Sequence, residues 1–433
     1  MDEVAHRRAL RRAVIAAAVG TTIEWYDFFL YSTVTGLVFG KLFFPNSDPL
    51  IGTLQAFLIY AVGFASRPIG AAIFGHYGDR IGRKSTLIAT LLLMGIATVA
   101  VGLVPGYNSI GPWAAVTVSF LRFVQGIGVG GEWGGSVLMA MEWSHRTDRR
   151  GFFASWPQFG VPAGLFLANL AVFVMSWATG DEFFTWGWRV PFLLSAVLIV
   201  IGLVIRLSIE ETPTFLRVVA EKRVEKAPIA EVIRRQPWQI LQSAFIRQVE
   251  QSSFYVYTAY IFSYGTQALS LSRNFLLAGV LVASCIAFVA VPYFGHLSDR
   301  VGRRKMFIAG VIVSAVFAFA YFAALNTGNS SIIFGIIAVS LIPHAMVYGP
   351  EAALIAECFT GRLRYSGASL GYQLASLVAG GPAPLIAAYL VLVFHSGFAV
   401  AAYLGLCAII SFIAAYFIPD YTNKDISAEY EHV

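Results

Sequence analysis

Long runs of apolar residues alternate with short polar or basic segments along the whole chain. A helix needs roughly 20 apolar residues to cross the hydrocarbon core of a bilayer. Twelve runs of about this length or longer can be placed on the 433 residues, so the pattern predicts an all-α membrane protein. The expected spans cover residues 13–40, 51–76, 85–104, 112–142, 151–177, 188–208, 239–268, 273–297, 305–325, 330–359, 366–395 and 397–418.

The composition supports this interpretation. Hydrophobic residues make up 58% of the chain and charged residues 12%, and the mean hydropathy is +0.70; soluble domains carry about 25% charged residues. The net charge of +6 would suit nucleic acid, but the basic residues are confined to particular loops, as orientation in a membrane requires. We therefore expect the lipid bilayer, and not nucleic acid, as a partner. Cys285, Cys358 and Cys407 lack paired spacing, so neither disulfides nor a metal site is expected.

One long polar insertion, residues 209–238, divides the chain into two groups of six expected spans, residues 1–208 and 239–433. If the amino terminus lies inside, 24 of the 30 Lys and Arg residues fall on the inner side. This asymmetry predicts that both termini are cytoplasmic and that the protein spans the plasma membrane many times. The exceptions are Lys41, Arg189 and Arg273 in outer loops and Arg67, Arg122 and Arg247 within spans.

The two halves also repeat one motif. GHYGDRIGRK runs from Gly75 to Lys84 and GHLSDRVGRRK from Gly295 to Lys305, each after the second span of its half. Glu142 and Glu357 occupy matching places before basic inner loops. The sequence therefore predicts two pseudo-symmetric six-helix halves that arose by duplication.

The plan of two duplicated six-helix halves resembles the major facilitator superfamily. The strings RFVQGIGVGGEWGG and WGWRVPF carry this resemblance beyond the repeated loops. TTIEWYDFFLY, FASRPIGAAIFGHYGDRIGRK and GGEWGG resemble, more narrowly, the metabolite:proton symporter family, whose members import shikimate, 2-oxoglutarate, citrate or betaine-type osmolytes with protons. The resemblance implies a monomeric transporter whose halves rock about a central site. The sequence has no phosphate loop and no nucleophile–base arrangement, so neither a cofactor nor an enzyme activity is expected.

The repeated loops are expected to latch the inner side shut. Asp79 would accept hydrogen bonds from the positive end of a neighbouring helix, while Arg80 and Arg83 reach carboxylates or helix carboxyl ends. Glu142 and Arg150 are the expected partners of this copy. The alternative is that these loops are only orientation signals with tight turns. The second copy repeats the set with Asp299, Arg300, Arg303 and Glu357.

Ionisable residues inside spans cost roughly 2.5–3.5 kcal/mol on insertion scales, so each is a functional candidate. Asp27 is expected near the middle of the first span and Arg122 about one turn outside the middle of the fourth. We assign Arg122 to a substrate carboxylate or to coupling, and Asp27 to the proton, with Glu24 as the substitute. A permanent Asp27–Arg122 pair that only joins two spans is the alternative.

Other intramembrane charges suggest ion pairs. Arg67 and Glu132 have similar expected depths, which favours a pair between them. Arg247 and Glu250 have the i, i+3 spacing of a helix-surface pair, and Glu351 is expected at the same depth. This second cluster could close an inner gate, or either group could be wholly structural.

Neutral polar residues in the spans are candidates for the substrate cavity. His344 could relay protons at ordinary pH, although a lone histidine is also a common hydrogen-bonded core residue. The side chains expected to line the cavity with Arg122 are Tyr31, Gln125, Glu132, Gln158, Tyr255, Tyr257, His344 and Gln373.

The expected function is proton-coupled import of a small organic anion by alternating access. An osmolyte transporter for proline or betaine is one alternative, although osmosensing relatives carry a long coiled-coil tail and this chain has about 15 residues after the last span. A drug/proton antiporter is another, but it would lack EWYDF and GGEWGG. SGASLGYQLASLVAGG, between residues 366 and 381, looks closest to shikimate-type members.

Asp79→Asn should reduce transport while membrane insertion and substrate affinity stay nearly intact, because the change removes a latch contact and not a binding group. Uptake, membrane abundance and binding of the same labelled substrate would be compared with the wild type. Normal transport by a correctly inserted variant would remove the case for a latch.

Overall fold

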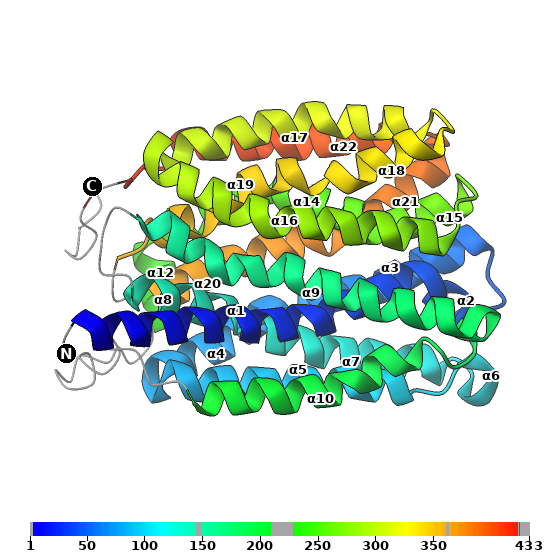
Figure 1. Cartoon of the computed structure of the whole chain (residues 1–433), viewed down its shortest axis with the longest axis horizontal. Helices are drawn as coiled ribbons and strands as arrows, with labels where there is room; N and C mark the ends of the chain where they lie inside the picture. Colours follow the sequence, from blue (N-terminus) through cyan, green and yellow to red (C-terminus); the bar gives the residue numbers. More distant parts are fainter. Residues whose placement is uncertain (1–2, 144–148, 209–227, 361–362, 423, 425–433) are drawn as a thin grey trace.

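The computed structural model describes residues 3–143, 149–208, 228–360, 363–422 and 424, and every regular element in these ranges is helical. The spanning helices run along one direction and form two groups of six, as the sequence predicts (Figure 1). Three short helices lie outside the spans, namely α6 (Tyr107–Ile110), η3 (Gly180–Phe184) and α12 (Pro228–Arg235).

Several spans of the first half are interrupted near their middle. Its elements are α1 (Glu3–Val34) continued by η1 (Thr35–Phe39) and α2 (Gly40–Phe43), α3 (Pro49–Ala65) with α4 (Arg67–Ile81), α5 (Arg83–Leu103), α7 (Trp113–Gly130) with α8 (Trp133–Trp143), α9 (Arg150–Thr179) and α10 (Arg189–Leu207).

The second half shows the same kind of interruption. Its elements are α13 (Pro237–Ile246), α14 (Gln248–Tyr255), η4 (Val256–Tyr260) and α15 (Ile261–Gln267) in one span, then α16 (Arg273–Val301), α17 (Arg303–Leu325), α18 (Ser330–Val339) with α19 (Leu341–Ala356), α20 (Arg364–Ala375) with η5 (Ser376–Gly380) and α21 (Pro382–Phe394), and α22 (Gly397–Phe417).

Ten helical stretches of the described chain are long and apolar enough to cross a membrane by composition alone. The two spans outside this set are α1 and the run α13–α15. Both carry buried charged or amide side chains, among them Asp27, Arg247 and Glu250. These two helices are less apolar because they place polar groups inside the protein.

The local backbone repeats between the halves. Gly82 and Gly302 have φ angles of 108° and 103° and stand directly before α5 and α17. This conformation favours glycine, which explains the glycine at this place in both motif copies. The π-helical segments η1 and η4 also occupy corresponding places in the first span of each half.

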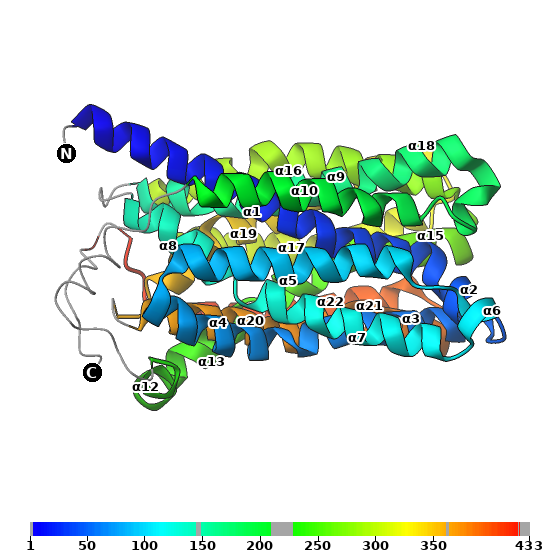
Figure 2. The same ribbon diagram turned by 90° about the horizontal axis from the view of Figure 1, so that it is seen from below.

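The halves meet along two seams. The α9 helix of the first half packs against α16 of the second, and α3 and α4 pack against α21 and α20. The α9–α16 seam crosses the middle of Figure 1. The first described turn of α1, together with α8 and α12, lies at one end of the molecule in both views (Figures 1 and 2). We call this end, where the repeated loops also lie, the latch end.

Close packing within the first half depends on glycine. A Cβ at Gly126 of α7 would overlap the carbonyl oxygen of Gly63 and the hydroxyl of Ser66. A Cβ at Gly130 would overlap the carbonyl oxygen of Arg67. Thus α7 approaches the α3–α4 break at backbone distance, as small residues allow in membrane helices.

Gly126→Ala should therefore lower the free energy of unfolding by about 1–3 kcal/mol, the usual cost of overpacking. Gly335→Ala is the matched control, because nothing lies within 4 Å of its added Cβ. Thermal unfolding of the detergent-purified proteins measures the difference. Equal melting temperatures of both variants would contradict the packing argument.

Candidate functional site

Arg122 of α7 lies fully buried among aromatic rings. Its guanidinium carbon is 4.2 Å from the ring centroid of Phe28, 4.3 Å from that of Tyr31 and 5.0 Å from that of Tyr60. It also donates a hydrogen bond to the side-chain oxygen of Gln125. Ring faces stabilise a cation electrostatically but do not neutralise its charge. The predicted cavity residues Tyr31 and Gln125 therefore do surround Arg122.

Arg67 lies in the same aromatic region, at the start of α4 and directly after the break at Ser66. Its guanidinium carbon is 4.2 Å from the ring centroid of Phe28 and 4.1 Å from that of Phe64. One nitrogen donates to Ser376 of the second half at 3.4 Å. The two guanidinium groups thus share the ring of Phe28.

Neither buried arginine forms an ion pair with a carboxylate among the described residues, although Glu250 lies near enough to Arg67 to interact with its charge. The Nε and Nη2 atoms of both Arg67 and Arg122 make no hydrogen bond there. The predicted Arg67–Glu132 pair is wrong, because Glu132 faces α1 and α10 and is paired with Arg206. Two unpaired cations in one buried cage leave an excess of positive charge that an anion could balance.

Asp27 is fully buried but is not the ion-pair partner of Arg122. The hydroxyl groups of Thr98 on α5 and Ser195 on α10 face its carboxyl group. Gln125 connects the two residues indirectly, since its amide nitrogen donates to the Asp27 carbonyl oxygen at 3.2 Å and to the Thr98 hydroxyl at 2.8 Å. The alternative of a permanent Asp27–Arg122 pair is therefore wrong.

A second charged group joins α1, α10 and the turn between α7 and α8. Arg206 Nη2 lies 2.7 Å from Glu24 Oε1 and 2.8 Å from Glu132 Oε1. We call Glu24, Arg206 and Glu132 the triad. Sequence reasoning missed Arg206, which it counted with the inner loops because it stands in the last turn of its span. Its position inside an apolar run, two residues before Ser208, was the available signal.

A small cavity of about 10 Å³ lies beside the triad. A volume of this size holds about one water molecule and no organic acid. Gln158 and Gln373, two of the predicted cavity residues, lie in its wall, as does Trp133. The Trp133 indole donates to Gln158 at 3.0 Å, and the Gln373 amide donates to the Gly130 carbonyl at 3.3 Å.

The predicted Arg247 cluster is present in the second half. Arg247 lies 2.9 Å from Glu250 and 2.5 Å from Glu351. Its guanidinium carbon is 3.2 Å from the ring centroid of Tyr372, whose other stacking partner is Trp133 of the first half at 3.8 Å. The ion pairs therefore lie within one half, and stacked rings connect them to the other.

The remaining residues predicted to line the cavity lie in different surroundings. His344 lies 3.8 Å from Glu250 and stacks on Tyr348. Tyr255 packs against Phe28 and Phe64 across the halves, at ring distances of 6.1 and 5.1 Å.

Tyr257 does not belong to this site. Its ring lies 4.4 Å from that of Tyr321 on α17, within the second half. Tyr255 and Tyr257 are both predicted to line the cavity, but residues two apart on a helix do not face the same way, and only Tyr255 packs beside the arginine cage.

The second motif copy closes the latch end by joining the halves. Asp299 accepts hydrogen bonds from the backbone N–H groups of Gly151 and Phe152 at 2.8 and 2.9 Å. The acidic residue thereby caps the amino terminus of α9, where its charge also meets the positive end of the helix dipole.

Buried ion pairs reinforce this contact. Glu357 lies 3.0 Å from Arg150 and 3.1 Å from Arg303, and Arg303 lies 3.1 Å from Asp299. The assignment of Arg150 to the first copy is therefore corrected: it pairs with the second. Arg300 is exposed. We call Arg150, Asp299, Arg303 and Glu357 the second latch.

The segment after α22 is fastened to the second latch. Arg150 donates to the carbonyl oxygens of Tyr421 and Lys424 at 3.2 and 2.8 Å. Partial burial would raise the pKa of Asp420, but hydrogen bonds from Thr422 and from the Arg304 backbone hold this pKa below its ordinary value.

The first latch cannot be described in the same way. The side chains of Asp79, Arg80, Arg83 and Glu142 lie outside the described residues.

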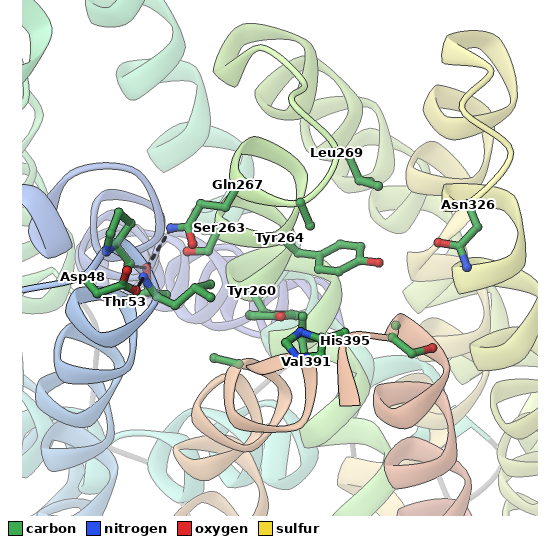
Figure 3. Close-up of a pocket in the computed structure, with 16 residues that line it drawn as sticks. Asp48, Thr53, Tyr260, Ser263, Tyr264, Gln267, Leu269, Asn326, Val391 and His395 are labelled. Carbon is green, nitrogen blue, oxygen red and sulfur yellow. Dashed lines mark hydrogen bonds between the residues drawn. The ribbon is translucent and has the colours of Figure 1, made fainter. Parts of the chain in front are cut away.

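The opposite end of the molecule is hollowed. A pocket of about 670 Å³ lies between the ends of α3, α15, α17 and α21. Figure 3 shows hydroxyl, amide and imidazole groups around it, with Gln267 donating to Thr53 at 2.7 Å. A neighbouring pocket of about 460 Å³ includes Lys41 and Arg273. In the described residues the halves are therefore joined at the latch end by the second latch, and the other end is hollowed by these two pockets.

Asp299→Ala should loosen the latch end, because two charge-assisted hydrogen bonds to α9 are lost. Each such bond contributes about 1.5–3 kcal/mol. Ser155→Cys reports the opening, since Ser155 is fully buried where α9 meets Gly295. The three natural cysteines would be replaced by serine. Maleimide should then label Cys at position 155 about tenfold faster in the Asp299→Ala background than in the background that keeps Asp299.

Asp181→Ala, an exposed change in η3 at the opposite end, is the control. Equal labelling rates in the two backgrounds would contradict the latch.

Comparison with known proteins agrees with this architecture. Residues 13–235 match the family model "Sugar (and other) transporter" and residues 282–432 match "Major Facilitator Superfamily". A crystal structure of the proton:xylose symporter XylE superposes with a TM-score of 0.77 at 17% identity, covering 98% of each chain. At this identity the likeness shows the fold.

Named relatives are considerably more similar in sequence. The inner membrane metabolite transport protein YhjE of Escherichia coli is 41% identical, over 93% of this chain and 92% of its own. The shikimate transporter of Escherichia coli is 40% identical, over 95% and 94%. The proline/betaine transporter of Escherichia coli is 32% identical, over 96% and 85%. The chain therefore belongs to the major facilitator superfamily, as a multi-pass membrane transporter in the same group as these metabolite, shikimate and proline/betaine carriers.

Proposed function

We propose that this protein is a proton-coupled importer of a small organic acid, shikimate-like or 2-oxoglutarate-like. The observation that carries the proposal is the pair of buried arginines, Arg67 and Arg122, without a carboxylate partner among the described residues. Arginine binds carboxylates through two parallel hydrogen bonds. A substrate carboxylate between them would supply the missing negative charge.

The surroundings of the two arginines suit a small ring or short chain. Phe28, Tyr31 and Tyr60 provide apolar faces from the first half, and Tyr255 provides one from the second. Ser376 adds a hydroxyl group from the second half. A substrate held by both halves would favour their closure around it, which alternating access requires.

Asp27 is the proposed proton carrier. A buried carboxylate without an ion pair costs several kcal/mol, and the neutral acid avoids this cost. Gln125 contacts both the Asp27 backbone and Arg122, so binding of an anion to Arg122 can affect the position of Asp27. Proton and anion would then enter together, and net movement of one would require the other.

The two seams between the halves supply the conformational step. Opening the latch end would separate Asp299 from α9 and Arg150 from Glu357, while the outer ends of α3 and α21 close. In the proposed orientation the latch end faces the cytoplasm, as the distribution of basic residues predicts.

A proline or betaine carrier is the second candidate. Its support is the aromatic cage, since ring faces also bind quaternary ammonium groups, together with the 32% identity to the proline/betaine transporter. The unpaired arginines favour an anion over a zwitterion, whose own cation would lie beside them.

Purified protein in proteoliposomes with an inwardly directed pH gradient tests the proposal. Labelled shikimate, 2-oxoglutarate, citrate and glycine betaine would be offered in parallel. We expect gradient-dependent uptake of at least one acid, abolished by a protonophore. Uptake of betaine with none of the acids would overturn the proposal.

Arg122→Lys should reduce this uptake by about tenfold or more, because lysine cannot reproduce a two-bond contact or the stacking on Phe28 and Tyr31. Arg235→Lys is the matched control, since Arg235 is exposed and its ion-pair partner among the described residues is Glu231 of its own helix. Initial rates at several substrate concentrations separate a loss of affinity from a loss of turnover. Equal rates for both variants would exclude Arg122 as an anion-binding residue.

A further inference from the structure

The triad contains two carboxylates but only one arginine. A single nitrogen, Arg206 Nη2, contacts both Glu24 and Glu132, and all three side chains are at most 4% exposed. The second oxygen of Glu24 makes no hydrogen bond among the described residues. If both carboxylates were ionised, one net negative charge would remain in the interior.

The other groups that the structure describes around the triad do not offset this charge. Ser136 donates to Glu132 at 3.4 Å, and Thr21 faces the same carboxylate. The phenol of Tyr365 faces Arg206 and donates to the Gly131 carbonyl. Lys84 lies nearer the latch end, where its ammonium group binds the Leu207 carbonyl at 2.8 Å.

Two carboxylates that share one arginine therefore bind one proton between them. Releasing that proton would leave an uncompensated buried charge, whereas holding it leaves a neutral group. Such a pair titrates as a unit, and the proton belongs to neither glutamate alone. Removing either glutamate would leave a simple one-to-one ion pair that needs no proton.

The triad also stands in the right place to pass a proton on. Glu24 is three residues from Asp27 on α1, within one helical turn and on its latch-end side. On α10, Ser195 faces Asp27, and Arg206 follows eleven residues later, about 16 Å nearer the latch end. The cavity of about 10 Å³ beside Glu24 and Glu132 has room for about one water molecule.

We propose that the triad is a second proton-binding site, which receives the coupling proton from Asp27 and releases it toward the latch end. This inference rests on the proposed proton-coupled import. In the transfer, the Asp27 carboxyl loses its proton to the carboxylate pair, directly or through one water molecule, and Asp27 becomes ionised. Release to the inner solution, once the latch end is open, returns the pair to its anionic form. Arg206 is a positioning residue that stays charged throughout.

Infrared difference spectroscopy tests proton binding without any substrate. The reconstituted protein in deuterated buffer would be compared at acidic and alkaline pH as wild type, Glu24→Gln, Glu132→Gln and Asp27→Asn. We expect the wild type to show carboxylic-acid C=O bands, one of which is lost in both glutamate variants. Asp27→Asn should remove a different band.

Glu231→Gln is the control for an exposed glutamate and should leave these bands unchanged. If Glu24→Gln and Glu132→Gln both retain every acid band of the wild type, the triad is a structural brace and the proposal fails.

Transport then tests the relay. Uptake of labelled shikimate driven by a pH gradient would be compared with shikimate exchange at equal pH, which needs binding and rocking but no net proton movement. Both glutamate variants should lose accumulation against the gradient by a larger factor than they lose exchange. Equal losses of the two activities would overturn the relay.

A wild type that moves none of the offered acids would contradict the proposed function, and the infrared bands would still decide whether the triad binds a proton.

Discussion

The arrangement of this protein depends on how a low-dielectric interior accommodates buried charge. Five arginines of the described chain are at most 2% exposed: Arg67, Arg122, Arg206, Arg247 and Arg303. An unpaired ion in such surroundings costs several kcal/mol, so each must find compensation from a carboxylate, an aromatic face or a ligand. Arg206, Arg247 and Arg303 each meet two carboxylates. Arg67 and Arg122 meet aromatic rings.

This division of partners separates roles across the molecule. The groups around Arg206 and Arg247 each contain one carboxylate more than they have arginines, which suits protons. In the second latch Arg150 and Arg303 balance Asp299 and Glu357. The arginines among rings have spare positive charge, which suits an anion. Because the excess negative charge and the excess positive charge lie in different places, the proposed proton and organic anion can occupy separate sites in one protein. In the proposed mechanism their coupling comes from shared helices, chiefly α1 and α7, and not from direct contact.

Several of these charged residues stand where a membrane-spanning helix is interrupted. Arg67 follows the break at Ser66, Glu132 stands in the turn between α7 and α8, and Arg247 stands between α13 and α14. At a break the backbone changes direction. A long side chain there can point in a direction that an uninterrupted helix would not allow. The breaks also free backbone carbonyls, such as that of Gly130, to accept side-chain donors from the other half. Irregular backbone inside the membrane is tolerated here because it is buried in protein.

The closed latch end and the hollowed opposite end follow from different chemistry. At the latch end Asp299 caps α9, and Glu357 binds two arginines, so the halves are joined by charge-assisted bonds with defined geometry. At the opposite end the amides and hydroxyls of residues such as Tyr260, Tyr264 and Gln267 line the pocket, together with the carboxylate of Asp48 and the imidazole of His395. The proposed alternating access would break the specific bonds at the latch end and bring together the polar surfaces at the other.

The sequence by itself determined the spans, the two repeated halves and, apart from Arg206, the charges inside the membrane. These features are local: hydropathy, glycine in the repeated turns and the i, i+3 spacing of Arg247 and Glu250 can each be seen within a few neighbouring residues. Only the tertiary structure decided which cation meets which anion. It paired Glu132 with Arg206 and not Arg67, and it left Asp27 apart from Arg122. The physical reason is that such pairs join residues 74 or more positions apart, and their meeting depends on the rotation, breaks and close approach of separate helices.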